Sequence, residues 1–501
     1  MNTTRRSRIS PSRFALFAAG VICILAVQLA AAQGQTESSA VEQRIQRIQA
    51  ALMPAVLVEG QNLSSQTSSL SDRMAALHVT GVTVAVIHGG KIEWARGFGV
   101  TKIGGPPVTP ATLFQAGSIS KPVTAVAVLR LVESGKLDLD VDVNQYLKTW
   151  KVPDNEFTAR KKVTLRELLT HTAGVTVQGF PGYAAGEKVP ALVQVLNGEK
   201  PANTPAIRVD VEPGTIWRYS GGGFVVMQQL LEDVTGEPFP QLMQQMVLGP
   251  MGMVHSTFQQ PLPSNRVAET AMPYGLMGDP IPGGPHTYPE MAPAGLWTTP
   301  SDLAQFALEL QKALAGESNR ILSSSMARQM LTPGMGEWGL GIQIGGNKEH
   351  PYFTHGGVDW GFVSNLIAYN RGDGVVVMTN AFHGDLLAMQ IVSTVAYEYN
   401  WPDFQPARRT LVKIDPKVLD RYVGTYRSAP DFSATISKEG DQLYVQANNQ
   451  PKFEMLPESE NEFFLKAVDA QVTFVTDGSG GRASSLVLHQ GAQEMTAHRV
   501  E

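Results

Sequence analysis

Hydrophobic and polar positions divide the chain into two parts of different character. In the first part, an apolar run at 82–87, a Gly-Gly pair and a mixed run at 91–99 predict a β-hairpin. Runs at 362–369 and 374–380 flank an Asn-Arg-Gly-Asp turn and predict a second hairpin. Because one hairpin lies near each end of this region, we expect a single antiparallel sheet built from both ends, with a helical insertion between them.

Helical patterns fill the space between the hairpins. The run that begins at Ser118 is apolar on most faces, which is typical of a buried helix, and Pro122 indicates that the helix begins close to Ser118. From 138 to 260, helical patches alternate with Gly- and Pro-rich loops. Thr299 is the expected N-cap of a later helix, with Pro300 at its first position and Asp302 reaching back to the cap. A last helix is expected after Gly384.

The C-terminal part has the alternation of short β-strands. Runs at 434–437, 442–445, 472–475 and 485–488 are separated by turn residues, which predicts a small all-β, barrel-like domain. We expect five segments: an export signal at 1–32, a polar and helical segment at 33–74, an α/β domain at 75–400, a linker at 401–414 and the β-barrel domain at 415–501.

The first residues have the pattern of an export signal. Arginines at 5, 6, 8 and 13 precede an apolar stretch at 14–29, and Ala30–Ala31–Ala32 offers a small-residue cleavage site. We therefore expect an exported protein, periplasmic or secreted, with no stable membrane insertion after cleavage. The stretch is long enough that an uncleaved N-terminal anchor remains the alternative.

Composition narrows the function further. The only cysteine, Cys23, lies in the signal, so the mature chain would have no disulfide and no thiol nucleophile. Without four of its 40 basic residues it would keep 45 acidic ones, a net charge of about −9, which does not suit nucleic acid. The histidines show no metal-ligand spacing, so we expect neither a metal nor another cofactor. The oligomeric state is not predicted.

The chemistry begins at Ser118 and Lys121. Residues three apart share a helix face, so the ammonium group of Lys121 would lie beside the hydroxyl of Ser118 and help to remove its proton. A serine hydroxyl needs such help before it attacks a carbonyl. In isolation the pattern is equally compatible with a helix-capping serine beside a surface lysine.

Four more motifs follow Ser118 in order. They are Leu168–Leu169–Thr170–His171–Thr172–Ala173–Gly174, Trp217–Arg218–Tyr219–Ser220–Gly221, Pro293–Ala294–Gly295–Leu296, and His355–Gly356–Gly357 before Gly361–Phe362. With Ser118 and Lys121, this set resembles the penicillin-recognising serine hydrolases related to class C β-lactamases, D-aminopeptidases, DD-peptidases and β-lactamase-fold esterases. The tail from about Asp415 is similar to the β-barrel appended to D-aminopeptidase-like members.

The resemblance implies a β-lactamase/transpeptidase-like fold and assigns catalytic roles. Ser118 would be acylated while Lys121 keeps its proton labile, and Tyr219 would act as the base. His355 stands where the family's K-T-G motif has lysine, either as a second cation when protonated or as a neutral hydrogen-bond donor. The backbone N–H groups of Ser118 and Val358 would form the oxyanion hole. His171 is expected to be structural.

The departures from the family pattern concern substrate binding. The Asn of the Y-x-N motif is Gly221, the Thr of K-T-G is Gly356, and Gly357 follows. Each lost hydrogen bond to a charged or buried partner costs about 1.5–3 kcal/mol, which weakens β-lactam recognition but leaves the acyl-transfer groups.

The sequence therefore predicts an exported serine hydrolase that acts by acyl-enzyme catalysis on a small-molecule or peptide substrate. D-amino-acid-containing peptides or small esters are the expected substrates. The alternatives are a true serine β-lactamase and a non-catalytic peptide-binding or structural protein on the same fold.

Overall fold

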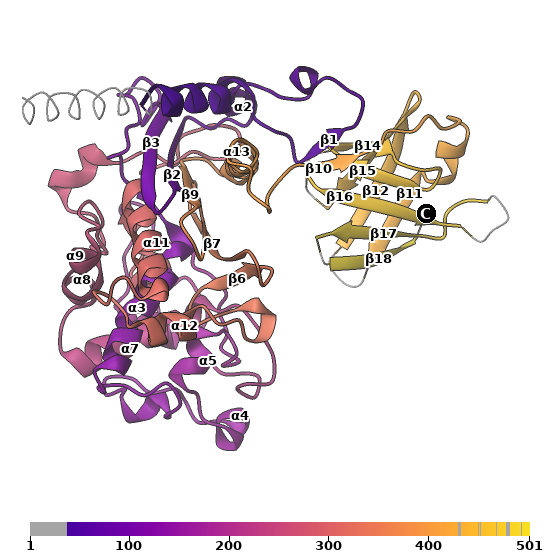
Figure 1. Cartoon of the computed structure of the whole chain (residues 1–501). Coiled ribbons are helices and arrows are strands. Elements are labelled where there is room, and N and C mark those ends of the chain that lie inside the picture. The colour runs from indigo at the N-terminus through magenta and orange to yellow at the C-terminus, as the bar shows by residue number, and fades with distance from the viewer. Residues whose placement is uncertain are drawn as a thin grey trace, which may run out of the picture.

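A computed structural model describes residues 38–428, 432–448, 450, 452–466, 468–476, 481–491 and 493–500. It contains an α/β body and a closed eight-stranded β-barrel, joined through two short strands (Figure 1). The predicted fold class, a β-lactamase/transpeptidase-like domain followed by a small all-β barrel, is confirmed. The predicted export signal at 1–32 lies outside the described residues.

Both predicted hairpins belong to one antiparallel sheet with the strand order β3-β2-β9-β8-β7-β6. Its strands are β2 (Gly81–His88), β3 (Lys91–Gly99), β6 (Gln343–Gly346), β7 (Pro351–Asp359), β8 (Phe362–Tyr369) and β9 (Gly374–Thr379). The first hairpin pairs with the last strand, because β2 lies beside β9. The sheet is thus built from both ends of the domain, as the pattern predicted.

The sheet separates two hydrophobic clusters. On one face, Ala85 and Ile87 of β2 belong to the larger cluster, which includes α11 (Pro300–Ala315) and the helical insertion. On the other face, Val84 and Val86 pack with α13 (Gly384–Glu398) and a helix over 38–50. This alternation along one strand explains why β2 is apolar throughout, since both of its faces are covered.

Most of the remaining helices and strands of the α/β body are short, and α7 (Gly221–Thr235) is the long one among them. The others are α2 (Leu70–Ala76), β4 (Phe114–Gln115), α4 (Glu156–Arg160), α5 (Leu165–Leu169), α6 (Leu192–Asn197), α8 (Phe239–Met243), α9 (Gly249–Met251), α10 (Met291–Ala294), β5 (Trp297–Thr298) and α12 (Ser324–Met330).

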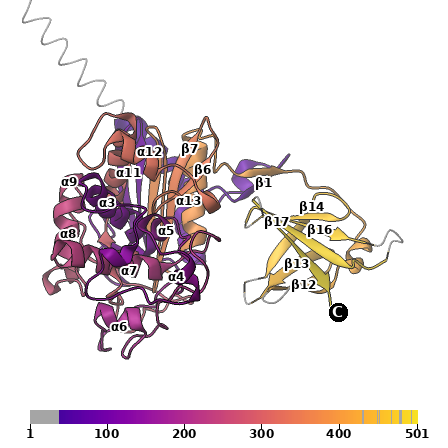
Figure 2. The ribbon, with the colours of Figure 1, turned by 90° about the horizontal axis from the view of Figure 1, so that it is seen from below.

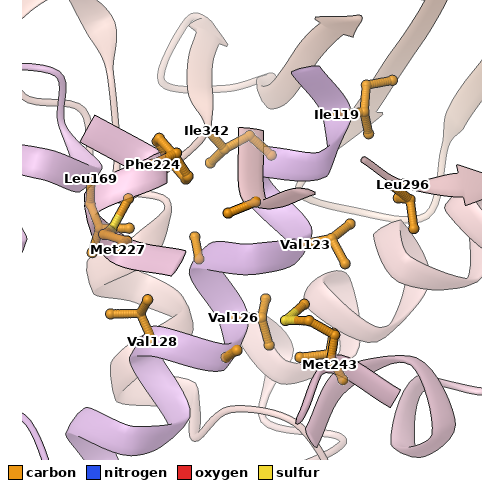
Figure 3. Close-up of a cluster of buried hydrophobic side chains, with 14 of the residues drawn as sticks. Ile119, Val123, Val126, Val128, Leu169, Phe224, Met227, Met243, Leu296 and Ile342 are labelled. Carbon is orange, nitrogen blue, oxygen red and sulfur yellow. The ribbon is translucent and has the colours of Figure 1, made fainter. Parts of the chain in front are cut away.

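The helix predicted at Ser118 is buried in the centre of the α/β body. A 3₁₀ turn, η2 (Gly117–Ile119), leads directly into α3 (Ser120–Glu133). Figure 3 shows side chains of this segment and of the elements packed around it. Ile119, Val123, Val126 and Val128 belong to the segment, and Leu169, Phe224, Met227, Met243, Leu296 and Ile342 come from other elements. Because α3 is enclosed on most sides, it gives the residues at its first turn a rigid support.

The predicted N-cap of α11 is confirmed, but the predicted role of Asp302 is wrong. Thr299 Oγ1 accepts a hydrogen bond from the backbone N–H of Asp302 at 3.2 Å, as expected of an N-cap. The Asp302 carboxylate does not reach back to the cap. It accepts instead from His255 N at 2.8 Å and Ser256 Oγ at 2.7 Å, because a preceding loop supplies donors within its reach.

The segment predicted as a linker contains a strand. Within it, β10 (Ala407–Arg409) pairs in parallel with β1 (Val56–Val58), and the two form a separate two-stranded sheet. Figure 2 shows β1 between the α/β body and the barrel. Val56 and Val58 also pack against Phe464 of the barrel. The barrel therefore contacts this strand pair as well as being joined to it by the chain.

The barrel strands follow one another in sequence. They are β11 (Gly424–Ser428), β12 (Phe432–Glu439), β13 (Gln442–Ala447), β14 (Phe453–Pro457), β15 (Glu462–Leu465), β16 (Ala470–Val475), β17 (Ser485–Gln490) and β18 (Gln493–Arg499). All neighbours are antiparallel, and β11 pairs with β18 to close the barrel. No helix in the described part of the chain is long and apolar enough to cross a membrane.

Candidate active site

Ser118 and Lys121 lie together as their spacing predicted. The ammonium Nζ of Lys121 donates a hydrogen bond to Ser118 Oγ at 2.8 Å. Ser118 is half-buried within an otherwise buried run, while Lys121 is only 2% exposed. The serine is thus partly exposed, whereas the lysine that holds its hydroxyl is buried.

The Pro293–Leu296 motif positions Lys121 from the opposite side. Lys121 Nζ also donates to the carbonyl oxygen of Pro293 at 3.1 Å. One residue before the lysine, Ser120 Oγ donates to Gly117 O at 2.6 Å and accepts from Leu296 N at 3.0 Å. These bonds fix the ammonium in place, because a buried cation needs partners for its donors.

Tyr219 lies against Lys121, and His171 holds the backbone on both sides of it. The Nζ of Lys121 is 4.9 Å from the centre of the Tyr219 ring. His171 O accepts from Arg218 N at 2.8 Å, and His171 Nδ1 accepts from Ser220 N at 3.1 Å. The imidazole also packs 4.4 Å from the Tyr219 ring, centre to centre. His171 therefore has the geometry of a positioning residue, which agrees with its expected structural role.

His355 is buried in the same group of rings. Its ring centre lies 6.3 Å from that of Tyr219 and 5.5 Å from that of Trp338. Burial, together with the nearby charge of Lys121, lowers the pKa of His355 to about 3. The neutral imidazole is therefore the form present near neutral pH, which does not support the expectation of a second cation.

The hydrogen bond made by His355 indicates its tautomer. Nδ1 donates to the carbonyl oxygen of Gly356 at 2.5 Å, and Nε2 has no hydrogen-bond partner among the described residues. With the proton on Nδ1, Nε2 is an acceptor. The alternative in which neutral His355 donates to the substrate through Nε2 would require the other tautomer.

Strand β7 passes unusually close to the turn that carries Ser118. A Cβ on Gly357 would lie 1.9 Å from Ala116 O, and a Cβ on Gly117 would lie 2.5 Å from Val358 N. Gly117 also has a positive φ of 53°. The two glycines allow this approach, which places the proposed oxyanion donors, Ser118 N–H and Val358 N–H, on adjacent segments. Their role remains a prediction.

The two positions that depart from the family pattern differ in the space around them. A Cβ on Gly221 would lie 2.9 Å from Phe180 Cε2 and 3.0 Å from Gln178 O, so a larger residue does not fit without movement. A Cβ on Gly356 would meet nothing closer than 3.7 Å. Other residues thus occupy the space that the Asn side chain of the family's Y-x-N motif would need at position 221. The space for the Thr side chain of K-T-G at position 356 is open.

Two buried carboxyl groups near the site were missed in the sequence. Asp359 Oδ2 accepts from Gly117 N at 3.2 Å, so it supports the turn of the nucleophile, and burial raises its pKa well above the usual range. Glu290 is fully buried, its oxygens have no hydrogen-bond partner among the described residues, and burial raises its pKa to about 8. No local pattern marks them, because their burial is created by segments distant in sequence.

Aromatic side chains form the surroundings of the site. Trp217 packs 5.7 Å from Trp338, and Trp338 packs 5.7 Å from Tyr219. Beyond Val358, Trp360 stacks on His286 with ring centres 5.6 Å apart and is 43% exposed. In the described part of the chain, no cluster of His, Cys, Asp and Glu side chains could hold a metal ion.

Comparison with known proteins agrees with this arrangement. The chain belongs to the beta-lactamase family, whose model matches residues 67–392. A second model, a domain of unknown function (DUF3471), matches residues 408–499. Among curated relatives, penicillin-binding protein 4* of Bacillus subtilis is 23% identical over 464 residues, which cover 87% of this chain and 98% of the relative.

Solved structures show the same fold. The octameric penicillin-binding protein homologue from Pyrococcus abyssi aligns over 85% of this chain and 98% of its own, with a TM-score of 0.57 and 21% identity. The D-amino acid amidase from Ochrobactrum anthropi aligns over 66% of this chain and 97% of its own (TM-score 0.53, 20% identity). EstCE1, a hydrolase with promiscuous acyltransferase activity, aligns over 65% and 96% (TM-score 0.54, 23% identity).

Proposed function

We propose that this protein is a serine hydrolase that forms an acyl-enzyme on Ser118 and cleaves neutral ester or amide bonds. One observation carries the proposal: the ammonium of the buried Lys121 lies 2.8 Å from Oγ of the half-buried Ser118 and 4.9 Å from the centre of the Tyr219 ring. A hydroxyl, a buried amine and a phenol in contact are the groups that activate a serine nucleophile.

The chemistry follows from these positions. Ser118 Oγ bonds to the substrate carbonyl carbon while its proton passes to Tyr219, which acts as the base beside the ammonium of Lys121. The proton then goes to the departing alcohol or amine as its bond to the acyl carbon breaks. Water hydrolyses the acyl-enzyme through the same groups and regenerates Ser118. The backbone N–H groups of Ser118 and Val358 would stabilise the oxyanion in both steps.

The surroundings favour a substrate that carries no carboxylate. His355 is neutral, Gly356 has no hydroxyl, and Gly221 has no amide, so three groups expected to bind a β-lactam or an anionic peptide end are absent or uncharged. Trp217 and Trp360 supply partly exposed apolar surface instead. Small esters and amides of D-amino acids with apolar side chains fit this chemistry. The O. anthropi D-amino acid amidase shares the fold, and its name supports the amides; EstCE1 shares the fold and supports acyl transfer.

Labelling with a fluorophosphonate probe tests the nucleophile. The wild-type protein should be modified once, on Ser118, and Ser118→Ala should lose the modification while keeping its melting temperature. Lys121→Met, which keeps the length of the side chain, should slow labelling by about 100-fold or more. A Ser118→Ala variant labelled as fast as the wild type would exclude the proposed mechanism, and a folded wild type without labelling would favour a non-catalytic role.

Turnover of three substrates tests the class. We expect kcat/KM to be highest for a p-nitrophenyl ester, followed by a D-alanine p-nitroanilide, with nitrocefin the poorest. His355→Lys introduces a cation and should raise nitrocefin turnover relative to the ester. If nitrocefin is the best substrate of the wild type, the protein is a β-lactamase instead.

We also propose that residues 1–32 direct export. The support is their sequence alone, Arg-rich and then apolar up to Ala30–Ala31–Ala32. N-terminal sequencing of protein recovered from cell fractions tests it: an exported chain beginning at Gln33 agrees, and an intact N-terminus would indicate the uncleaved anchor.

A further inference from the structure

The C-terminal barrel encloses a cavity as well as a core. The cavity has a volume of about 560 Å³, which is within the range of about 300–1,000 Å³ that small-ligand pockets occupy. Its barrel wall is mainly apolar, and the residues that form it are Phe432, Ala434, Val445, Ala447, Gln450, Phe453, Leu465, Val468, Ala470, Val472, Leu486, Leu488, Gln490 and Met495.

Small side chains explain why this space exists. An eight-stranded barrel is just wide enough for its own side chains to fill, or to hold one small ligand. Three alanines, at 434, 447 and 470, point into the cavity from β12, β13 and β16. At such positions larger residues would close the interior.

The opposite end of the barrel is filled. Tyr422 stacks on Phe474 at 4.3 Å between ring centres, and Phe463 packs edge-on against both rings at 5.6 Å. Along β16, Ala470 and Val472 line the cavity whereas Phe474 belongs to this aromatic plug. The barrel therefore has one closed end and one hollow end.

The hollow end faces the start of α13. His383, Asp385 and Leu386 complete the cavity wall. A groove of about 470 Å³ continues from there along α13, and it shares Asp385, Leu386, Val468 and Gln490 with the cavity. The wall is thus apolar at depth and polar at the opening, which is the pattern of a site for an amphiphile.

Charge at the opening limits the head group. Asp385 carries an exposed carboxylate at the first turn of α13. In the groove, the carboxylate of Asp469 is paired with Arg409 at 3.1 Å. Because Asp385 would repel an anion and no lysine or arginine of the described residues lines the opening without a carboxylate partner, an uncharged or cationic head fits better than a carboxylate.

This site is separate from Ser118. The core around α13 includes Val84 and Val86 of β2, while the core around α3 includes Ala85 and Ile87 on the other face of the same strand. The sheet therefore lies between the opening of the barrel and the nucleophile.

We propose that the barrel binds a single-chain amphiphile, with its aliphatic or aryl chain in the cavity and an uncharged or cationic head beside Asp385.

Fluorescence of N-phenyl-1-naphthylamine with the full-length protein tests the cavity. The probe should brighten with a stoichiometry of one per chain. Ala434→Phe fills the cavity and should weaken binding at least about tenfold. The matched control is Thr435→Phe, the next residue of β12, whose side chain points outward and is exposed, and it should bind like the wild type.

A second variant keeps the test valid if Ala434→Phe does not fold. Val445→Thr keeps the shape of a cavity-lining side chain but adds a hydroxyl, and it should weaken probe binding by roughly threefold to tenfold. No brightening with the wild type, or unchanged affinity in folded Ala434→Phe or Val445→Thr, would overturn the cavity assignment.

Displacement of the probe tests the head group. Below their micellar concentrations, dodecan-1-ol and dodecyltrimethylammonium should displace the probe at concentrations at least about threefold lower than dodecanoate, because the carboxylate meets Asp385. Asp385→Asn should remove the preference against dodecanoate. Strongest displacement by dodecanoate in the wild type would overturn the assignment of the head group.

Discussion

The charge of His355 determines how activity should depend on pH. Burial and Lys121 lower its pKa from the usual 6.5 to about 3, so the imidazole stays neutral across the neutral range. We therefore expect the pH profile of kcat/KM for a neutral ester to lack any ionisation of His355 between about pH 5 and 8. His355→Gln should remove no limb of the profile in this range. A limb near pH 6–7 that this variant removes would show that His355 titrates in the active enzyme.

The same shift has a consequence for stability. The folded protein binds the proton of His355 less tightly than the unfolded chain does. The free energy of unfolding therefore has its full contribution from the neutral imidazole above about pH 6.5, and this contribution is lost as the pH falls toward 3. Denaturant titrations should show that the stability difference between the wild type and His355→Gln shrinks or reverses over this acid range.

Glu290 should make stability depend on pH in the opposite direction, because it favours the folded state at low pH. Burial raises its pKa from 4.5 to about 8, so the folded protein keeps a proton that the unfolded chain releases. This favours folding below about pH 4.5, and the advantage is lost as the pH rises to about 8.

Glutamine cannot ionise. We therefore expect the melting temperature of Glu290→Gln to fall less than that of the wild type when the pH is raised from 5 to 8. For a domain of this size, each kcal/mol of difference corresponds to roughly 1–2 °C. Parallel melting curves of the two proteins over this range would show that the carboxyl is ionised or solvated in the folded state.

At the scale of secondary-structure elements, the contact between β7 and the turn of the nucleophile depends on glycine. A methyl group on Gly357 would overlap Ala116 O at 1.9 Å. Gly357→Ala should therefore lower stability by about 1–3 kcal/mol and slow fluorophosphonate labelling of Ser118, because β7 must move away from the turn.

The neighbouring residue supplies the control for this test. Gly356→Ala adds the same methyl group where the nearest atom is 3.7 Å away, so its melting temperature should equal that of the wild type. Equal melting temperatures and labelling rates for both variants would show that β7 and η2 are not in close contact.

Elements with a strong local pattern could be predicted from the sequence. The hairpin β2–β3, the pair β8–β9 and the helix α3 have apolar periodicity with turn or start signals, and four of the barrel strands alternate clearly. The strand β7 was missed, because His355–Gly356–Gly357 has neither a β-branched run nor regular alternation. It is a strand because β6 and β8 pair with it on both sides.

The candidate site was predictable only in part for a related reason. Ser118 and Lys121 are close in sequence, so helix geometry alone places them together. The neutral state of His355 and the burial of Glu290 depend on residues packed from other elements, which a single sequence does not reveal.

At the scale of the whole molecule, the interface between the barrel and the α/β body determines whether the parts are separable. The strand pair β1–β10 belongs to the connection. It meets the barrel through a small apolar cluster, in which Val56 and Val58 contact Phe464, and through ion pairs of Arg409 with Glu458 and Asp469. A chain that ends after Thr410 keeps β10 and both sides of the active site. We expect it to be soluble and to be labelled on Ser118 at a rate close to that of the full-length protein.

The same truncated chain distinguishes the two sites of this protein. It should lose the binding of N-phenyl-1-naphthylamine completely, because every apolar strand of the cavity is removed, while labelling of Ser118 persists. Replacing Val56 and Val58 with threonine in the truncated chain should restore solubility if the exposed valines cause aggregation. If that variant is still insoluble, the barrel is needed for the α/β body to fold. If it is soluble but unlabelled, the barrel supports the active site through the sheet.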